Sequence, residues 1–201
     1  MPPALPDHLH QVRLVERLAA DDETALDALL EIHWDRLVDY AFGLVGSVDI
    51  ASDLVQEAFI RLWTRRTHWA PGSVAGPILF RIVRNGALDH LRAEAVRAQR
   101  TEVMTLTPSV AATPDQTIEE QELAAAVNLA LRALGARERE VVVLSRFDGL
   151  SRSEIAEVMS LAPQTVSNLL SLGLTRLQRA LGPYLDAEHA VQIRRRSLHL
   201  A

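Results

Sequence analysis

The sequence predicts an all-α protein built from two small helical domains that are joined by a flexible acidic linker. Apolar residues recur at helical spacing along most of the chain, and no stretch shows the sustained alternation of a strand. The periodicity fails between residues 100 and 117, where Thr, Pro, Ser and Ala dominate. With 201 residues, the chain can hold two such domains. We place them at 1–99 and 118–182, with the linker at 100–117 and a C-terminal tail at 183–201.

Composition excludes several classes of function. The chain has no cysteine, which rules out disulfides, thiolate catalysis and cysteine-based zinc sites. No apolar run is long enough to cross a bilayer, and the first residues lack the pattern of a secretory signal. We therefore expect a soluble, cytoplasmic protein that does not insert into a membrane. Every basic residue is arginine, which suits phosphate contacts but also follows from a genome rich in G and C.

The first domain is predicted to hold four helices. The first runs through Val12 and Leu18, and the second is capped by Asp21 or Asp22 and ends at Gly46-Ser47. The third covers about 49–66, and a loop rich in Pro and Gly separates it from the fourth at about 78–97. His33 lies on the apolar stripe of the second helix, so we expect a core histidine with its hydrogen bonds satisfied. The scattered histidines have no metal-ligand spacing.

The third and fourth helices carry opposite charges on their outer faces, although the whole chain has a net charge of −5. Asp53, Glu57 and Arg61 share one stripe of the third helix. The fourth helix has an arginine-rich stripe that can follow a nucleic-acid backbone. Local charge decides docking more than the total does, so the pair can bridge a protein and a nucleic acid. Taken alone, either stripe is also compatible with an ordinary solvated helix face.

The loop before the fourth helix holds His68 and Trp69. An aromatic side chain on a loop beside a cationic stripe can stack on an unstacked base. The same tryptophan can instead pack the loop onto the bundle. The residues alone leave both interpretations open.

The second domain has the spacing of a helix-turn-helix. Ser151 and Glu154 form a capping box, residues 160–162 make a turn, and Pro163 begins the final helix. We expect that helix to stop at Gly182-Pro183. Its outward face can enter a major groove, where Asn168 pairs with adenine. Exposed leucines on the same face are equally suited to a protein groove.

These motifs resemble a bacterial RNA polymerase sigma factor of the extracytoplasmic-function (ECF) type, in the sigma-70 family. Residues 53–63 resemble the core-binding helix of region 2, and residues 79–92 resemble its promoter-melting helix. Residues 137–156 resemble the start of region 4. The resemblance covers roughly residues 22–97 and 120–181. It implies a region 2 helical bundle and a region 4 helix-turn-helix domain.

The resemblance assigns three sets of binding residues. Contacts to the core polymerase clamp helices fall on Asp53, Leu54, Gln56, Glu57, Ile60 and Arg61. Contacts to the minus-ten DNA fall on His68, Trp69, Arg81, Arg84, Asn85, Asp89 and Arg92. Contacts to the minus-thirty-five DNA fall on Arg152, Gln164, Thr165, Ser167, Asn168, Leu169, Ser171, Leu172 and Arg176.

The chain departs from the family pattern at three places. Leu169, Leu172 and Leu174 stand where basic side chains are common on the recognition helix. Ala162 stands where a capping Ser is usual, and Gly76-Pro77-Ile78 replaces the usual Trp-bearing start of the fourth helix. We therefore expect minus-thirty-five binding to be weak or apolar.

The sequence thus predicts a non-enzymatic transcription initiation factor that binds core RNA polymerase through its clamp helices and flap. It directs the polymerase to promoter DNA and opens the minus-ten element. We find no catalytic constellation, and we expect no metal or other cofactor and a monomeric free protein. An anti-sigma partner is an open question. Two other classes stay open: a stand-alone helix-turn-helix regulator and a sigma-like protein-binding adaptor.

Overall fold

The computed structural model describes residues 8–98 and 118–198, and every described element is helical. The all-α prediction is therefore confirmed for this part of the chain. The helices divide into two compact units. The first contains α1–α4 and residues 148–161, and the second contains α5, α6 and α8. The predicted linker, 100–117, lies outside the described residues.

The first unit begins with α1 (His8–Ala19), α2 (Glu23–Val45) and α3 (Val48–Thr64). Asp22 caps α2 by accepting a hydrogen bond from the Thr24 backbone N–H at 3.0 Å. Of the two predicted caps, Asp21 and Asp22, it is therefore Asp22 that begins the helix. Gly46 ends α2 with a φ of 75°, in the left-handed region that glycine tolerates best. Ser47 then caps α3, so the break predicted at this pair of residues is confirmed.

The predicted third helix extends too far, because α3 ends at Thr64 and a short 3-10 helix, η1 (Arg66–His68), follows. The predicted start of the fourth helix is also wrong by three residues. Helix α4 (Ala75–Ala98) already includes Pro77 in its first turn. A proline fits there because the first four N–H groups of a helix have no partner within the helix.

The core of the first unit lies where α2, α3 and α4 pack against one another. The ring of Tyr40 meets that of Phe80 edge-on, with centroids 5.2 Å apart. Gly86 lets α4 approach α3 closely, because a Cβ there would lie 2.9 Å from Leu54 Cδ2. The apolar side chains of this core are fully or nearly fully buried: Leu29, Leu37, Val55, Leu62, Leu79, Phe80 and Val83.

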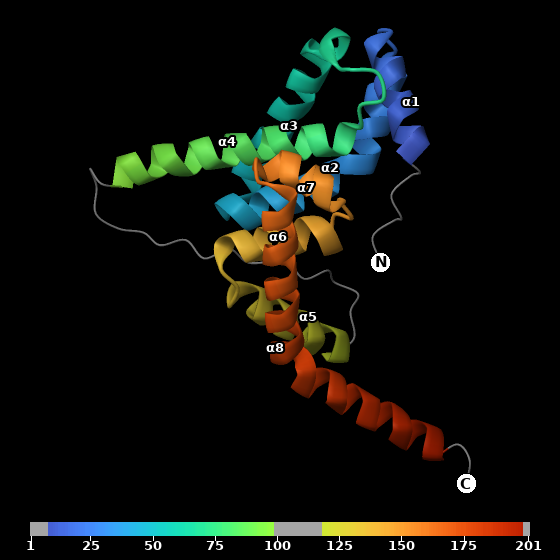
Figure 1. The fold of residues 1–201 in the computed structure, drawn as a ribbon, viewed down its shortest axis with the longest axis vertical. Helices are drawn as coiled ribbons and strands as arrows, with labels where there is room; N and C mark the ends of the chain where they lie inside the picture. Colours follow the sequence, from blue (N-terminus) through green and yellow to red (C-terminus); the bar gives the residue numbers. More distant parts are fainter. Residues whose placement is uncertain (1–7, 99–117, 199–201) are drawn as a thin grey trace. The chain divides into compact units, whose positions relative to one another are not determined.

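Helix α7 (Arg152–Met159) also belongs to the first unit, where it packs on α4 (Figure 1). The capping box predicted from the sequence is present. Glu154 accepts a hydrogen bond from the Ser151 N–H at 2.7 Å, and Ser151 Oγ accepts one from the Glu154 N–H at 3.3 Å. Ser160, with a φ of 54°, ends the helix in the predicted turn.

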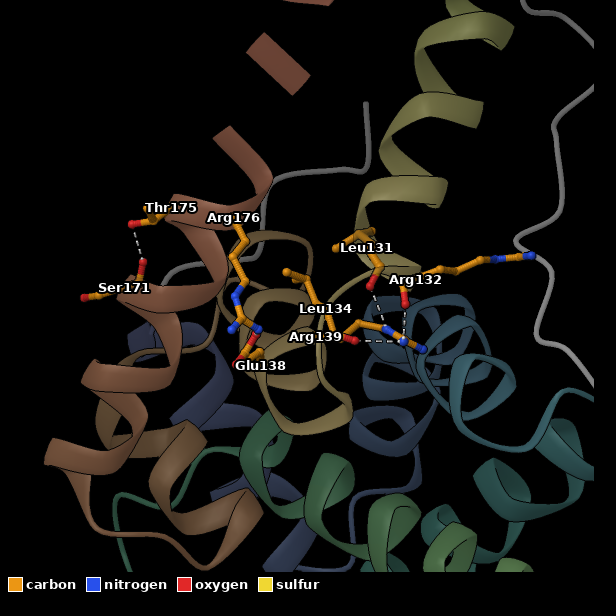
Figure 2. A network of polar contacts seen from close by, with 8 residues as sticks. All are labelled: Leu131, Arg132, Leu134, Glu138, Arg139, Ser171, Thr175 and Arg176. Carbon is orange, nitrogen blue, oxygen red and sulfur yellow. Dashed lines mark hydrogen bonds and ion pairs between the residues drawn. The ribbon is translucent and has the colours of Figure 1, made fainter. Parts of the chain in front are cut away.

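The second unit consists of α5 (Ile118–Arg132), α6 (Ala136–Arg146) and α8 (Pro163–Leu198), and α8 packs on both of the others. Arg139 fastens the end of α5 by donating to the carbonyl oxygens of Leu131, Arg132 and Leu134 at 2.8–3.1 Å (Figure 2). Gly173 permits close contact between α8 and α6, since a Cβ there would lie 2.7 Å from Val142 Cγ2.

The prediction that the final helix stops at Gly182-Pro183 is wrong, because α8 continues to Leu198. A proline inside a helix removes one backbone hydrogen bond and often bends the helix rather than ending it. Figure 1 shows such a bend along α8. None of the described helices is long and apolar enough to span a membrane.

Candidate functional site

The predicted protein-binding stripe of α3 is open to solvent. Asp53, Gln56, Glu57 and Arg61 are exposed, and Ile60 is 52% exposed between them. Arg61 Nε lies 2.7 Å from Glu57 Oε1, so this pair is already satisfied within the helix. An exposed i,i+4 pair contributes only a few tenths of a kcal/mol, about 0.3–0.5, and is easily exchanged for a partner. An apolar side chain framed by charged ones suits a protein contact.

Leu54 differs from the rest of this set, because it is half-buried and faces Gly86 of α4. Its side chain fills the space that the glycine leaves between the two helices. Leu54 thus holds the acidic stripe of α3 and the basic stripe of α4 in one rigid pair. Its predicted contact with core polymerase stays a prediction.

The arginine-rich stripe of α4 also faces outward. Arg81 and Arg92 are exposed, Arg84 is half-buried, and Asn85 is exposed beside them. Arg92 Nη1 lies 2.7 Å from Asp89 Oδ1, so part of the positive charge is neutralised locally. The side chains of this pair are both 73% exposed, and solvent screens such a pair strongly.

The loop beside this stripe is fastened to the bundle by aromatic contacts. Trp69 is half-buried, and its Nε1 donates to the Leu62 carbonyl at 3.3 Å. Arg66 lies over the Trp63 ring at 4.2 Å and pairs with Asp21. Trp63 is therefore half-buried under an arginine rather than enclosed in the core. The role of Arg66 was not predicted, although its position three residues after Trp63 on a helical turn is consistent with this contact.

His68 is exposed at the end of η1. Both side chains of this loop have a hydrogen bond, since His68 Nδ1 lies 3.3 Å from Thr67 Oγ1 and Trp69 Nε1 donates to the Leu62 carbonyl.

The predicted DNA-reading residues of α8 are mostly exposed, with Ser167 and Leu169 half-buried. Gln164 Nε2 donates to Asn168 Oδ1 at 3.0 Å, which orients the Asn168 amide. Arg176 Nη1 lies 2.6 Å from Glu138 Oε2 and fastens α8 to α6, so its charge is already engaged (Figure 2). Arg152 is exposed on α7, in the first unit, whereas the other residues of this set lie in the second.

The first unit also contains a buried polar cluster that the sequence analysis did not single out as a group. His33 and Asp148 are 1% and 5% exposed, and Arg36 Nη2 lies 3.7 Å from Asp148 Oδ1. Neither ring nitrogen of His33 nor Asp148 Oδ2 has a hydrogen-bond partner among the described residues. His33 is a core residue as predicted, but its expected hydrogen bonds are not formed.

Burial shifts both groups toward their neutral forms. It raises the pKa of Asp148 to about 7, against the attraction of Arg36 and with some help from Asp39. It lowers the pKa of His33 to about 4, and Arg36 adds to that shift. The cluster borders a cavity of about 190 Å³. No group of three or more metal-ligating side chains occurs in the part of the chain that the structure describes.

Comparison with known proteins identifies two regions of the sequence. A sequence model of sigma-70 region 2 matches residues 29–97, and one of sigma-70 region 4 matches residues 124–177. The two regions together define a transcription initiation factor of the sigma-70 type. The ECF RNA polymerase sigma factor BldN of Streptomyces coelicolor is 30% identical, covering 90% of this chain and 69% of that protein. The sigma factor CarQ of Myxococcus xanthus is 30% identical, over 84% of this chain and 95% of its own length.

Solved structures agree on the fold. The sigma factor RpoE of Bartonella quintana, crystallised with the anti-sigma factor NepR, aligns with a TM-score of 0.64 at 25% identity. That alignment covers 78% of this chain and 96% of RpoE. CnrH, in complex with the cytosolic domain of CnrY, aligns with a TM-score of 0.62 at 23% identity and has the same fold. The chain belongs to the ECF group of RNA polymerase sigma factors.

Proposed function

We propose that this sigma factor holds core RNA polymerase with the stripe of α3 and opens the minus-ten element with α4 and the Trp69 loop. The observation that carries the proposal is the tight α3–α4 pair, with an acidic and apolar outer face on one helix and a basic one on the other. Leu54 against Gly86 joins these faces rigidly. The two DNA strands can therefore be separated at a fixed position relative to the polymerase.

Region 4 has a supporting role in this proposal. The exposed face of α8 offers Gln164, Thr165 and Asn168 to a major groove, but Arg176 is engaged with Glu138. Few free positive charges remain there to contact phosphates, and phosphate contacts supply much of DNA affinity. Minus-thirty-five binding by this unit alone is expected to be weak, and the polymerase supplies most of the affinity.

The partners follow from this role. They are core polymerase, promoter DNA and, by likeness to RpoE and its complex with an anti-sigma factor, an anti-sigma protein. The work of a sigma factor is recognition and strand capture rather than covalent chemistry, and we propose that it takes place in the cytoplasm on a monomeric chain. No cofactor is needed for strand capture by charge and stacking.

The decisive test reverses the charge of the α3 stripe with Asp53→Arg and Glu57→Arg together. Both side chains are exposed, so the fold is preserved, and association with core polymerase is expected to fall at least about tenfold from charge repulsion. The matched control is Asp27→Arg with Glu31→Arg, an exposed pair on α2 at the same spacing. Association is measured by competition against a labelled sigma factor.

The second part of the test asks for strand opening. Holoenzyme is assembled on promoter fragments that it selects from a genomic library, and unpaired thymines are detected with permanganate. Arg81→Gln is expected to keep core association and to reduce thymine reactivity, because Arg81 is exposed and the change removes a positive charge proposed to contact a phosphate. Sequence-specific DNA binding without polymerase would instead favour a stand-alone regulator. Normal core association by the charge-reversed α3 variant would refute the assignment of the α3 stripe.

A further inference from the structure

The turn between α1 and α2 contains a residue with an unusual backbone conformation. Asp21 has a φ of 63°, in the left-handed region. Its N–H donates to the Leu18 carbonyl at 3.1 Å, and that of Asp22 donates to the Arg17 carbonyl at 3.1 Å. This is the hydrogen-bond pattern with which many helices end on a glycine, because a Cβ is strained at that position. An aspartate in place of the glycine points to a role for its side chain.

The Asp21 carboxylate reaches the loop between α3 and α4. Arg66 Nε donates to Asp21 Oδ1, and the pair joins residues 45 positions apart in the sequence. Arg66 is the first residue of η1, and η1 contacts α1 (Figure 1). This helix has three residues, and no side chain of the described residues caps it. Its position therefore depends on contacts with the rest of the first unit.

The same guanidinium makes two more contacts. Arg66 Nη1 donates to the Trp63 carbonyl at 2.9 Å, and its Cζ lies 4.2 Å from the centre of the Trp63 ring. Both contacts lie at the C-terminal end of α3, where carbonyl groups lack partners within the helix and a positive charge is favourable. The side chains of Arg66 and Asp21 are 25% and 66% exposed, so the ion pair alone is weak. A planar guanidinium with three contacts is nevertheless fixed in orientation.

His68 and Trp69 follow Arg66 within three residues. Trp69 Nε1 donates to the Leu62 carbonyl at 3.3 Å, which attaches the loop to α3 a second time. The contacts with Leu62 and Trp63 attach the loop to α3 alone, whereas the contact with Asp21 adds a fixed point on the α1–α2 turn. The sigma-70 region 2 match begins at residue 29, so this turn lies outside it.

We propose that Asp21 and Arg66 are positioning residues for strand capture. Through this ion pair, the turn between α1 and α2 fixes the loop that presents His68 and Trp69 to a base of the opened minus-ten element. A loop that is already ordered loses less conformational entropy when the base binds. Neither positioning residue contacts the base. The positioning role rests on the function proposed for this loop, whereas the attachment of the loop to the turn does not.

The attachment is tested without polymerase or DNA, by hydrogen exchange on the full chain. Asp21→Asn removes the charge and keeps a side chain that tolerates the left-handed region, and Asp21→Gly removes the side chain. Both are expected to raise exchange in residues 66–74 about threefold to tenfold. Arg17→Gln is the matched control, because it breaks the neighbouring ion pair with Asp22 in the same turn. Exchange in residues 66–74 is expected to stay unchanged in this control.

The positioning role is tested with holoenzyme made from Asp21→Gly. Relief of the backbone strain offsets the lost ion pair, so the thermal midpoint is expected to change by no more than about 2–4 °C. Association with core polymerase is expected to be unchanged, because the α3 stripe is intact. Permanganate reactivity of the minus-ten thymines is expected to fall about threefold to tenfold, since the loop must now be ordered during capture.

Single abasic sites separate positioning from a purely structural role. Each base of the non-template strand across the minus-ten element is removed in turn, and the affinity of the holoenzyme for the fragment is measured. Removal of the captured base is expected to weaken binding by the wild type more than binding by Asp21→Gly, because only the wild type offers that base an ordered loop. Removal of the other bases is expected to affect both proteins equally.

Three results would overturn the positioning role: unchanged exchange of residues 66–74 in Asp21→Gly, wild-type strand opening by that variant, or an abasic profile identical to that of the wild type. The double variant His68→Ala with Trp69→Ala tests the proposed function of the loop separately. Loss of opening in the double variant with normal opening in Asp21→Gly overturns the positioning role alone. Normal opening by the double variant refutes the function proposed for the loop, and with it the positioning role.

Discussion

Asp148→Asn should reverse the direction in which the stability of the first unit changes with pH. Asp148 and His33 are both buried, and their pKa values move in opposite directions, to about 7 and about 4. Their effects on stability therefore oppose each other over the same range of pH. Asp148→Asn replaces the carboxyl by an amide of the same shape, so it removes the pH effect of Asp148 and leaves that of His33.

The direction in which stability changes with pH depends on whether the folded or the unfolded state binds more protons. An unfolded Asp is ionised above its ordinary pKa of 3.8, while folded Asp148 keeps its proton until about pH 7. The folded state binds the extra proton, so its stability falls as pH rises through that window, by about 3 kcal/mol between pH 5 and pH 8. His33 is neutral when folded above about pH 4 but charged when unfolded below 6.5. The unfolded state binds that proton, so stability rises by about 2 kcal/mol from pH 5 to pH 8.

The wild-type free energy of unfolding is thus expected to fall by only about 1 kcal/mol from pH 5 to pH 8, whereas that of Asp148→Asn rises by about 2. Other groups facing the cluster are Arg36 and Asp39 from α2 and Glu154 from α7, and they are unchanged in the variant. Trp34, Trp63 and Trp69 all lie in the first unit, so tryptophan fluorescence during urea unfolding reports on it.

Asp27→Asn, on the exposed face of α2, is the control and should follow the wild-type profile. The reasoning is refuted if the profile of Asp148→Asn runs parallel to that of the wild type. A parallel profile would mean that the Asp148 carboxyl titrates alike in the folded and unfolded chain, so that its burial has no effect on stability.

Two further predictions concern the second unit. Gly173→Ala places a methyl group 2.7 Å from the stiff Val142 side chain and should destabilise α6 and α8 by about 2 kcal/mol. The control is Gly182→Ala, where a Cβ would have nothing within 4 Å, and this variant should be neutral or slightly stabilising. Hydrogen exchange of the two helices measures this, and equal effects of the two variants would contradict it. Arg139→Met should cost about 1–3 kcal/mol, because it removes the guanidinium that donates to three carbonyl groups at the α5 terminus. The control Arg137→Met changes an exposed side chain and should have almost no effect on unfolding monitored by circular dichroism. If Arg139→Met is as stable as Arg137→Met, the guanidinium does not hold the α5 terminus.

Local signals in the sequence predicted much of this structure. The Asp22 cap, the Gly46-Ser47 break and the Ser151–Glu154 capping box each depend on side chains within a few residues of one another, so short-range chemistry decides them. The helix ends at Pro77 and Pro183 were predicted wrongly because proline is compatible with two outcomes. It starts a helix when its missing N–H falls in the first turn, and it bends one when the neighbouring turns hold.

The helices that pack against each other could not be predicted from the periodicity of apolar residues. The apolar spacing of Ile155, Ala156 and Met159 shows which face of α7 is buried, but it says nothing of what buries it. An apolar face that belongs to a helix-turn-helix can equally well pack on α4, because non-directional burial does not distinguish partners. Polar groups do distinguish them, and here the poorly paired Asp148 and His33 disfavour the packing that the apolar face allows. The partner of an apolar helix face therefore has to be read from the tertiary structure, because periodicity identifies the buried face alone.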